Sequence, residues 1–336
     1  MPVRAATVYP ALAAMVLLLA VAAALVGAYP LGFGDALAVL RAALTGAPPA
    51  DQQSEIVLLS IRLPRIAAAV VLGACLAAAG AVYQQIFRNP LVSPDILGVS
   101  AGAGLGAVLG IFLSLSVFGI QALAFAGGLA AVALVMLIAS AVRRQDSVLV
   151  LVLSGIVIGA LAGSVTSLLK VLADPYDQLP AITFWLLGSL AAVNIDDVAA
   201  ALPVALVALV PLLALRWKVD ILSMGDEEAR ALGVDVGRVR LVLIVSATLM
   251  TAAVVSFAGV VGWVGLIIPH FARMLVGPGF ARLLPAAILI GAAFMLAVDT
   301  LARTISTTEV PLGIITSLIG APIFVVLLAR GRRVWS

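Results

Sequence analysis

AVVLGACLAAAGAV, residues 69–82, is a continuous apolar run made mostly of small side chains. It lacks the alternation of apolar and polar residues that a strand of a transmembrane barrel needs. Apolar runs of about 20 residues, the length that crosses a roughly 30 Å hydrocarbon layer as a helix, recur along the chain. Because a helix satisfies its own backbone in lipid, the pattern predicts an all-α polytopic membrane protein.

The composition of the whole chain supports this fold class. Of the 336 residues, 64% are hydrophobic and 10% are charged, and the mean hydropathy is +1.26. A soluble core could not hide so much apolar surface, so the expected surroundings are membrane lipid. The formal net charge is +3, but no basic cluster is interleaved with aromatic residues, and we expect no nucleic-acid partner.

Apolar runs separated by charged residues, Gly and Pro predict about ten transmembrane spans. The first run is too long for a typical signal peptide and is interpreted as a retained helix. The eighth run is too short to cross the membrane unaided. The predicted spans cover residues 5–28, 64–86, 95–115, 121–142, 148–172, 197–215, 239–257, 264–276, 283–302 and 313–329.

The loops on the two sides of these spans differ in charge. One side collects most of the Lys and Arg residues, among them Arg88, Arg216 and Arg282, whereas the opposite side is richer in acids such as Asp51 and Glu309. The positive-inside rule assigns the basic side to the cytoplasm. Both termini are therefore expected in the cytoplasm.

The longest predicted cytoplasmic loop, at about residues 218–240, contains the charged sequence SMGDEEARALGVDVGRVR. Ser223 and Asp226 have the spacing of a capping box, which predicts a short helix over residues 224–232.

Gly233 and Asp235, which come later in this loop, predict where the chain bends. Gly233 is suited to stop the short helix, and Asp235 to cap a second helix that continues into the seventh span. The loop is thus expected to form a helix-turn-helix elbow at the cytoplasmic surface. A solvated loop with amphipathic ends is the alternative.

The amino-acid sequence of this loop resembles that of the paired coupling helices of the FecCD-type permeases. These form the type II ABC importer family for iron-siderophores, heme and cobalamin. Ordered blocks from residue 56 onward carry the same resemblance. They are RLPR at 62–65, RNPLVSPDILGVSAGAGLG at 88–106, FWLLGSL at 184–190, GWVGLIIPHFARMLVG at 262–277, LLPAAILIGAAFMLAVDTLAR at 283–303 and EVPLGIITSLIGAPIF at 309–324.

The resemblance implies one transmembrane permease domain over residues 1–336 that works as a homodimer in the cytoplasmic membrane of a bacterium or archaeon. Two cytoplasmic ABC ATPase subunits and a periplasmic or lipid-anchored substrate-binding protein would complete the importer. The chain lacks a GxxxxGK[ST] phosphate loop, which agrees with ATPase activity on a separate subunit. The permease itself is expected to need no cofactor.

The resemblance also implies roles for individual residues. In the family the elbow docks on the ATPase, arginines on the outer side receive acidic residues of the binding protein, and the loop after the second span narrows the pathway. Here the ATPase-coupling residues are Gly225, Glu227, Ala229, Leu232, Gly233 and Val234, the docking residues are Arg62, Arg65 and Arg303, and the pathway and gate residues are Asn89, Leu91, Gly98 and Ser100.

Other polar residues in apolar surroundings have simpler expected roles. Arg62 and Arg65 flank Pro64, which suits the start of the second span, and arginines at a helix end commonly snorkel to the membrane interface. Asp299 is expected to pair with Arg303 one helical turn later. His270, the only histidine, has no neighbouring histidine, cysteine or acid in the sequence, and a structural hydrogen bond is favoured over a metal site.

The predicted function is alternating-access import of a metal chelate. Residues 176–190 resemble iron-siderophore permeases most, so an iron(III)-siderophore is the expected substrate, with heme or cobalamin as the alternative. An ion-coupled secondary transporter is the rival class, but it should carry ionisable groups in mid-span, and the span centres here are nearly free of charge. An intramembrane enzyme would need clustered catalytic groups, which the sequence lacks.

Overall fold

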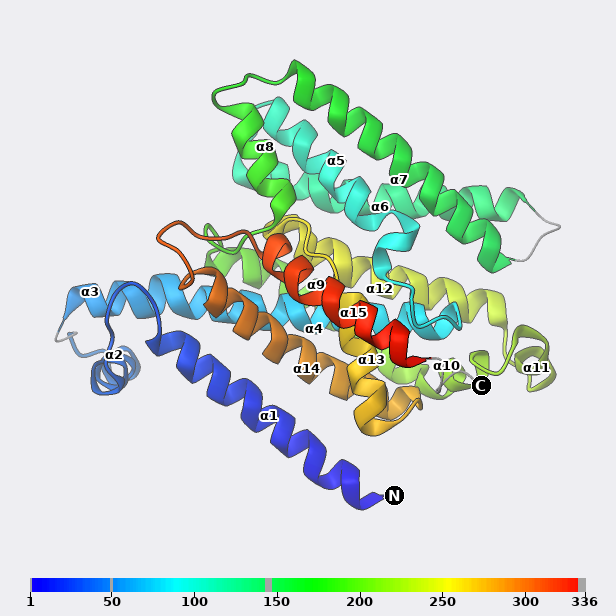
Figure 1. Cartoon of the computed structure of the whole chain (residues 1–336), viewed down its shortest axis with the longest axis horizontal. Helices are drawn as coiled ribbons and strands as arrows, with labels where there is room; N and C mark the ends of the chain where they lie inside the picture. Colours follow the sequence, from blue (N-terminus) through cyan, green and yellow to red (C-terminus); the bar gives the residue numbers. More distant parts are fainter. Residues whose placement is uncertain (1, 49–50, 143–146, 332–336) are drawn as a thin grey trace.

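The computed structural model describes residues 2–48, 51–142 and 147–331, and every regular element in these ranges is a helix (Figure 1). The predicted all-α polytopic class is confirmed. Ten helices correspond to the ten predicted spans: α1 (Pro2–Leu25), α4 (Leu63–Ile86), α5 (Val99–Phe112), α6 (Val117–Ala141), α7 (Ser147–Leu172), α9 (Ile195–Ala214), α12 (Val236–Ala258), α13 (Val264–Val276), α14 (Phe280–Ala302) and α15 (Leu312–Gly331).

Short helices occupy the connections between these spans. They are α2 (Phe33–Thr45), α3 (Gln52–Glu55), the π-helix η1 (Ile56–Arg62), the 3₁₀ helix η2 (Pro94–Leu97), α8 (Gln178–Leu187), α10 (Arg216–Leu222) and α11 (Asp226–Ala231). Within the described ranges, seven helices are long and apolar enough to cross a membrane by length and composition. The other three predicted spans are the shorter apolar helices α5, α13 and α15.

Helix α4 lies at the centre of the molecule and contacts α9, α12, α13 and α14 (Figure 1). Helix α1 covers α14, while α5, α6 and α7 form a second group. Helix α12 contacts α4 and α9 on one side and α5 and α6 on the other. It therefore joins the two groups.

The two ends of the bundle carry different connections (Figure 1). Helices α10 and α11 lie at the end where α1 begins and α15 finishes, and α2, α3 and α8 lie at the opposite end. We call these the inner end and the outer end.

Glycines allow the closest backbone contacts around α4. A Cβ at Gly73 would overlap the carbonyl oxygen of Gly291 on α14, and a Cβ at Gly80 would overlap that of Gly265 on α13. Gly73 and Gly80 are thus the positions that let α4 approach its neighbours at backbone distance. At Gly163 on α7, in contrast, an added Cβ would meet no atom within 4 Å.

The second span begins earlier than predicted. Asp51 accepts backbone N–H bonds from Gln53 and Ser54 and so caps α3, and the hydrogen bonds from Ser54 lower the pKa of this carboxyl. The helix then continues through η1 into α4, and Leu63 donates to the carbonyl of Leu58 five residues back. Pro64 lies in the first turn of α4, as predicted, but the chain before it is already helical.

We expect Gly80→Ala to destabilise the chain, because its methyl group must push α4 away from the backbone of α13. Overpacking of this kind costs about 1–3 kcal/mol. Thermal melting of the detergent-purified protein should show a lower Tm for Gly80→Ala, whereas Gly163→Ala should melt at or above the wild-type temperature. Equal Tm values for the two variants would contradict the packing described here.

Candidate functional site

The inner-end loop begins differently from the prediction. The Ser223 hydroxyl donates to the carbonyl of Asp220 at 2.6 Å, and α11 begins at Asp226 after Gly225. The Asp226 carboxylate accepts two bonds from Arg240 on α12, at 2.8 and 3.0 Å. The predicted capping box is therefore wrong, because a charge-assisted bond to the next helix occupies its acid.

The turn after α11 agrees with the prediction. Gly233 has φ +78° and donates to Arg230, while Val234 donates to Ala229, each at 2.9 Å. This pair of bonds is a Schellman motif, and Ala229 and Val234 are buried beneath it. Asp235 then caps α12 through a first-turn N–H. Helices α11 and α12 thus form the expected elbow, and α10, which was not predicted, extends it on the N-terminal side.

The six predicted coupling residues divide into two kinds. Gly225, Ala229 and Val234 are buried and shape the elbow, whereas Glu227, Leu232 and Gly233 are exposed. Leu232 is 59% exposed on the outside of the elbow, and Met224 is 63% exposed. The elbow therefore offers apolar side chains at the inner surface of the chain.

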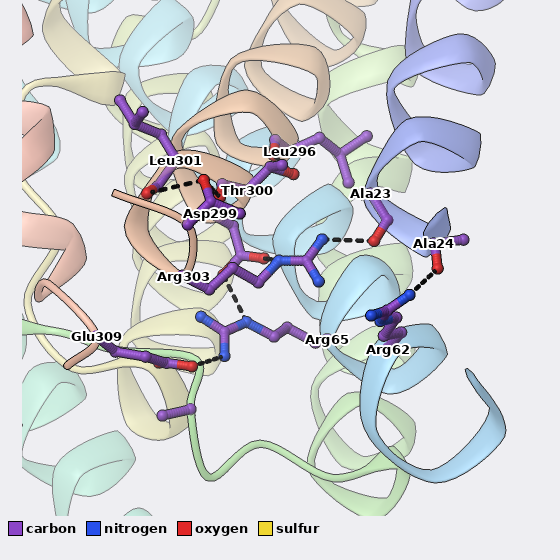
Figure 2. A network of polar contacts seen from close by, with 12 residues as sticks. Ala23, Ala24, Arg62, Arg65, Leu296, Asp299, Thr300, Leu301, Arg303 and Glu309 are labelled. Carbon is purple, nitrogen blue, oxygen red and sulfur yellow. Dashed lines mark hydrogen bonds and ion pairs between the residues drawn. The ribbon is translucent and has the colours of Figure 1, made fainter. Parts of the chain in front are cut away.

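Arg62 and Arg303 hold the end of α1 at the outer end of the bundle (Figure 2). Arg62 donates to the carbonyls of Ala24, Leu25 and Tyr29 at 2.6–3.1 Å. Arg303 donates to the carbonyl of Ala23. Both guanidinium groups thus bind unsatisfied carbonyls at a helix C-terminus, where a cation is favourable.

Arg65 lies beside them in a buried ionic cluster (Figure 2). It binds Asp299 at 2.7 Å and Glu309 at 2.5 Å, and the Asp299 carboxylate is 3.7 Å from Arg303. The side chains of Arg65 and Asp299 are 7% and 2% exposed, against 37% for Glu309. The predicted pair of Asp299 with Arg303 is confirmed, but its nearer partner, Arg65, was not predicted.

This geometry bears on the predicted docking residues. Arg62 and Arg65 are 4% and 6% exposed, so neither snorkels to the membrane interface. Together with Arg303, they point toward partners within the chain. Their docking role stays a prediction, and an acidic partner would have to compete with these contacts.

The predicted gate residues do not form one cluster. The Asn89 side chain accepts from the backbone of Leu91 at 2.9 Å, and both residues are exposed after α4. Gly98 has φ +77° and faces Gly155 on α7. Ser100 is buried and donates to Asp95. Asn89 thus lies at the inner surface, whereas Gly98 and Ser100 lie at the start of α5.

A cavity of about 1080 Å³ lies at the inner end, between α4, α10, α13 and α15. Its polar wall includes Gln84, Arg88, Asn89, Asp220, His270 and Arg273. Of these, only Asn89 was predicted as a pathway residue. His270 belongs to this wall, and the described residues contain no group of three metal-binding side chains. The cavity was not predicted because it joins four separate segments of the chain.

The buried ionic cluster generates a stability prediction. Asp299→Ala leaves Arg65 and Arg303 without their shared carboxylate, and breaking a buried pair typically costs about 3–5 kcal/mol. Arg238→Ala is the control, because its ion pair with Asp235 is exposed and should contribute less than about 1 kcal/mol. Unfolding in a denaturing detergent measures both changes. Similar losses would show that the cluster does not stabilise the bundle.

Comparisons with known proteins agree with this architecture. The profile of the FecCD transport family matches residues 14–330. The chain is 42% identical over 285 residues to the molybdate import system permease protein of Haemophilus influenzae, covering 85% of this chain and 83% of that protein. It is 46% identical over 284 residues to the cobalamin import system permease protein of Halobacterium salinarum, covering 84% and 76%.

A solved structure has the same fold. It is described as an inward-facing conformation of a metal-chelate type ABC transporter, and the two chains superpose with a TM-score of 0.87 at 38% identity, over 96% of this chain and 98% of that one. The family match covers nearly the whole chain. Members of this family are the membrane-spanning components of ABC transporters rather than the ATPases. The chain belongs to the FecCD transport family, and it is a permease subunit of a type II ABC importer.

Proposed function

We propose that the chain imports a metal chelate across the cytoplasmic membrane by alternating access, driven by ATP hydrolysis on a separate subunit. The elbow of α10, α11 and α12 is the observation that carries this proposal. An exposed helix with apolar residues at the inner end suits a groove on a cytoplasmic partner. The family membership makes an ABC ATPase the expected partner.

The elbow is built to transmit a displacement. Arg240 on α12 holds Asp226 at the first turn of α11 through two bonds, so the two helices are tied together. Helix α12 in turn contacts both helical groups of the bundle. A movement of α11 would therefore reach both groups through α12, which alternating access requires.

The proposed assembly contains further subunits. Two copies of the chain form one permease domain each, two ATPase subunits bind the elbows, and a periplasmic or lipid-anchored binding protein docks at the outer end. Both termini lie in the cytoplasm of a bacterium or archaeon. The coupling, docking and gate residues named from the sequence keep their proposed roles, with Ala229 and Val234 supporting the elbow from inside.

The proposed substrate is an iron(III)-siderophore, with heme or cobalamin as the alternative. Similarity to a solved metal-chelate transporter supports metal chelates as the general class of substrate. Similar identities to permeases named for molybdate and for cobalamin indicate that closely related permeases carry different cargo. Selectivity among chelates is therefore assigned mainly to the binding protein.

We expect Gly233→Pro to abolish coupled transport without preventing membrane insertion. Proline fixes φ near −65°, whereas Gly233 has φ +78°. A Cβ added at Gly233 would meet no atom within 4 Å, so the expected loss comes from the changed backbone and not from a steric clash. The complex, co-expressed with its ATPase and binding protein and reconstituted in liposomes, should lose at least about tenfold in ATP-driven uptake, a factor worth about 1.4 kcal/mol.

Gly237→Ala is the matched control, because it lies in the first turn of α12 and a Cβ there makes only an ordinary contact. It should transport normally. Normal ATP-driven uptake by Gly233→Pro would refute the coupling role of the elbow. Uptake by the isolated chain down an ion gradient would favour the secondary transporter instead.

A further inference from the structure

We infer that the inner-end cavity binds an anionic chelate, and that Arg88 and Arg273 are the groups that select the negative charge. The inference rests on the proposed import function, in which a chelate leaves the permease at the inner end. It adds a charge preference and two residues that neither the family match nor the sequence patterns assign. Five observations on the cavity carry it.

Arg273 supplies a cation without an acidic partner. It is half-buried on α13, and its Nη2 donates to Gln84 on α4 at 3.2 Å. The Gln84 amide nitrogen in turn donates to the carbonyl of Leu266. No carboxylate in the described part of the chain forms an ion pair with Arg273. A half-buried guanidinium that is positioned but not neutralised favours an incoming anion.

The acid on the cavity wall is already engaged. The Asp220 carboxylate accepts the backbone N–H of Phe280 at 2.6 Å, at the first residue of α14. The positive end of a helix dipole offsets part of a carboxylate charge. The cavity wall therefore keeps a positive balance from Arg88 and Arg273.

Arg88 occupies a position that normally favours glycine. Its N–H donates to Gln85, and the N–H of Asn89 donates to Gln84, which together form a Schellman motif at the end of α4. Arg88 has φ +48° in this motif. The corresponding position after α11 is Gly233. A non-glycine residue in the left-handed region costs free energy, and such strain points to a role for the side chain.

The size and wall of the cavity suit a chelate. Its volume of about 1080 Å³ is at the upper end of sites for small molecules. Apolar residues of α13 and α15, including Met274, Ile323 and Val326, form the rest of the wall. A mostly apolar surface with two cations can receive the organic body of a chelate and its net charge together.

The cavity also borders the elbow. Ser223, which precedes α11, lines it, and a Cβ at Gly225 would lie 3.6 Å from Nη1 of Arg88. A displacement of α11 would therefore move one wall of the cavity relative to Arg88. This places the anion site where the proposed ATP-driven movement can open or close it.

Two iron chelates of similar size and opposite charge test the inference. The full chain, in nanodiscs of neutral phosphatidylcholine, is titrated with radiolabelled ferric enterobactin, which is trianionic, and with ferrioxamine B, which is cationic. Wild type should bind the anion at least about tenfold more tightly, the factor expected from one charge-assisted hydrogen bond. The double variant Arg88→Gly/Arg273→Gln should bind the two probes within about twofold.

The variants separate binding from folding. Arg88→Gly alone removes the cation and also relieves the strained backbone conformation, so its Tm should equal or exceed that of wild type. Its preference for the anionic chelate over the cationic one should fall. Arg282→Gln is the control, because it removes an exposed inner-end arginine that does not line the cavity. It should keep the full preference.

Several outcomes would overturn the inference. These are equal binding of the two probes by wild type, binding of neither, or a preference that survives the double variant. Retention of phosphatidylglycerol that depends on the two arginines, without a chelate preference, would assign the cavity to lipid. If the assembled complex still hydrolyses ATP and imports its cargo in any of these cases, only this inference fails and the proposed importer function remains.

Discussion

Direct backbone contact between α4 and its neighbours is the constraint on which the rest of the structure depends. In lipid the hydrophobic effect cannot draw helices together, so close packing has to do so. Gly73 and Gly80 remove the side chains that would separate α4 from α14 and α13. With α4 held in this way, its outer end contributes Arg65 to the ionic cluster, and its inner end contributes Arg88 to the cavity.

Polar side chains at the two ends of this apolar bundle fix one helix to another. At the outer end, Arg62 and Arg303 bind carbonyls at the end of α1, which fixes α1 against α4 and α14. At the inner end, Arg240 fixes α11 to α12. In the proposed mechanism, the outer end resists movement, whereas the elbow at the inner end carries it into both helical groups through α12.

The sequence predicted the features that depend on local chemistry. Apolar run length predicted the spans, and Gly233 and Asp235 predicted the bend of the elbow because each acts on backbone groups within a few residues. The family resemblance added the expected subunits.

The failures involve contacts between distant parts of the chain. Arg65 and Asp299 are 234 residues apart, so no local spacing could indicate their pair. The expected Ser223 cap failed for a related reason, because Asp226 is bound to Arg240 on the next helix. The helix that precedes Pro64, α3 and η1, was not predicted.

Site-specific cross-linking from the elbow tests the central claim most directly. Leu232→Cys presents a thiol on the exposed side of the elbow, and the native Cys75 is buried and should not react. In membranes that contain the whole importer, a short bifunctional reagent should link this thiol to the ATPase subunit, and Leu44→Cys on α2 at the outer end should give no such product. A failure of Leu232→Cys to cross-link, or equal cross-linking from both positions, would contradict the account.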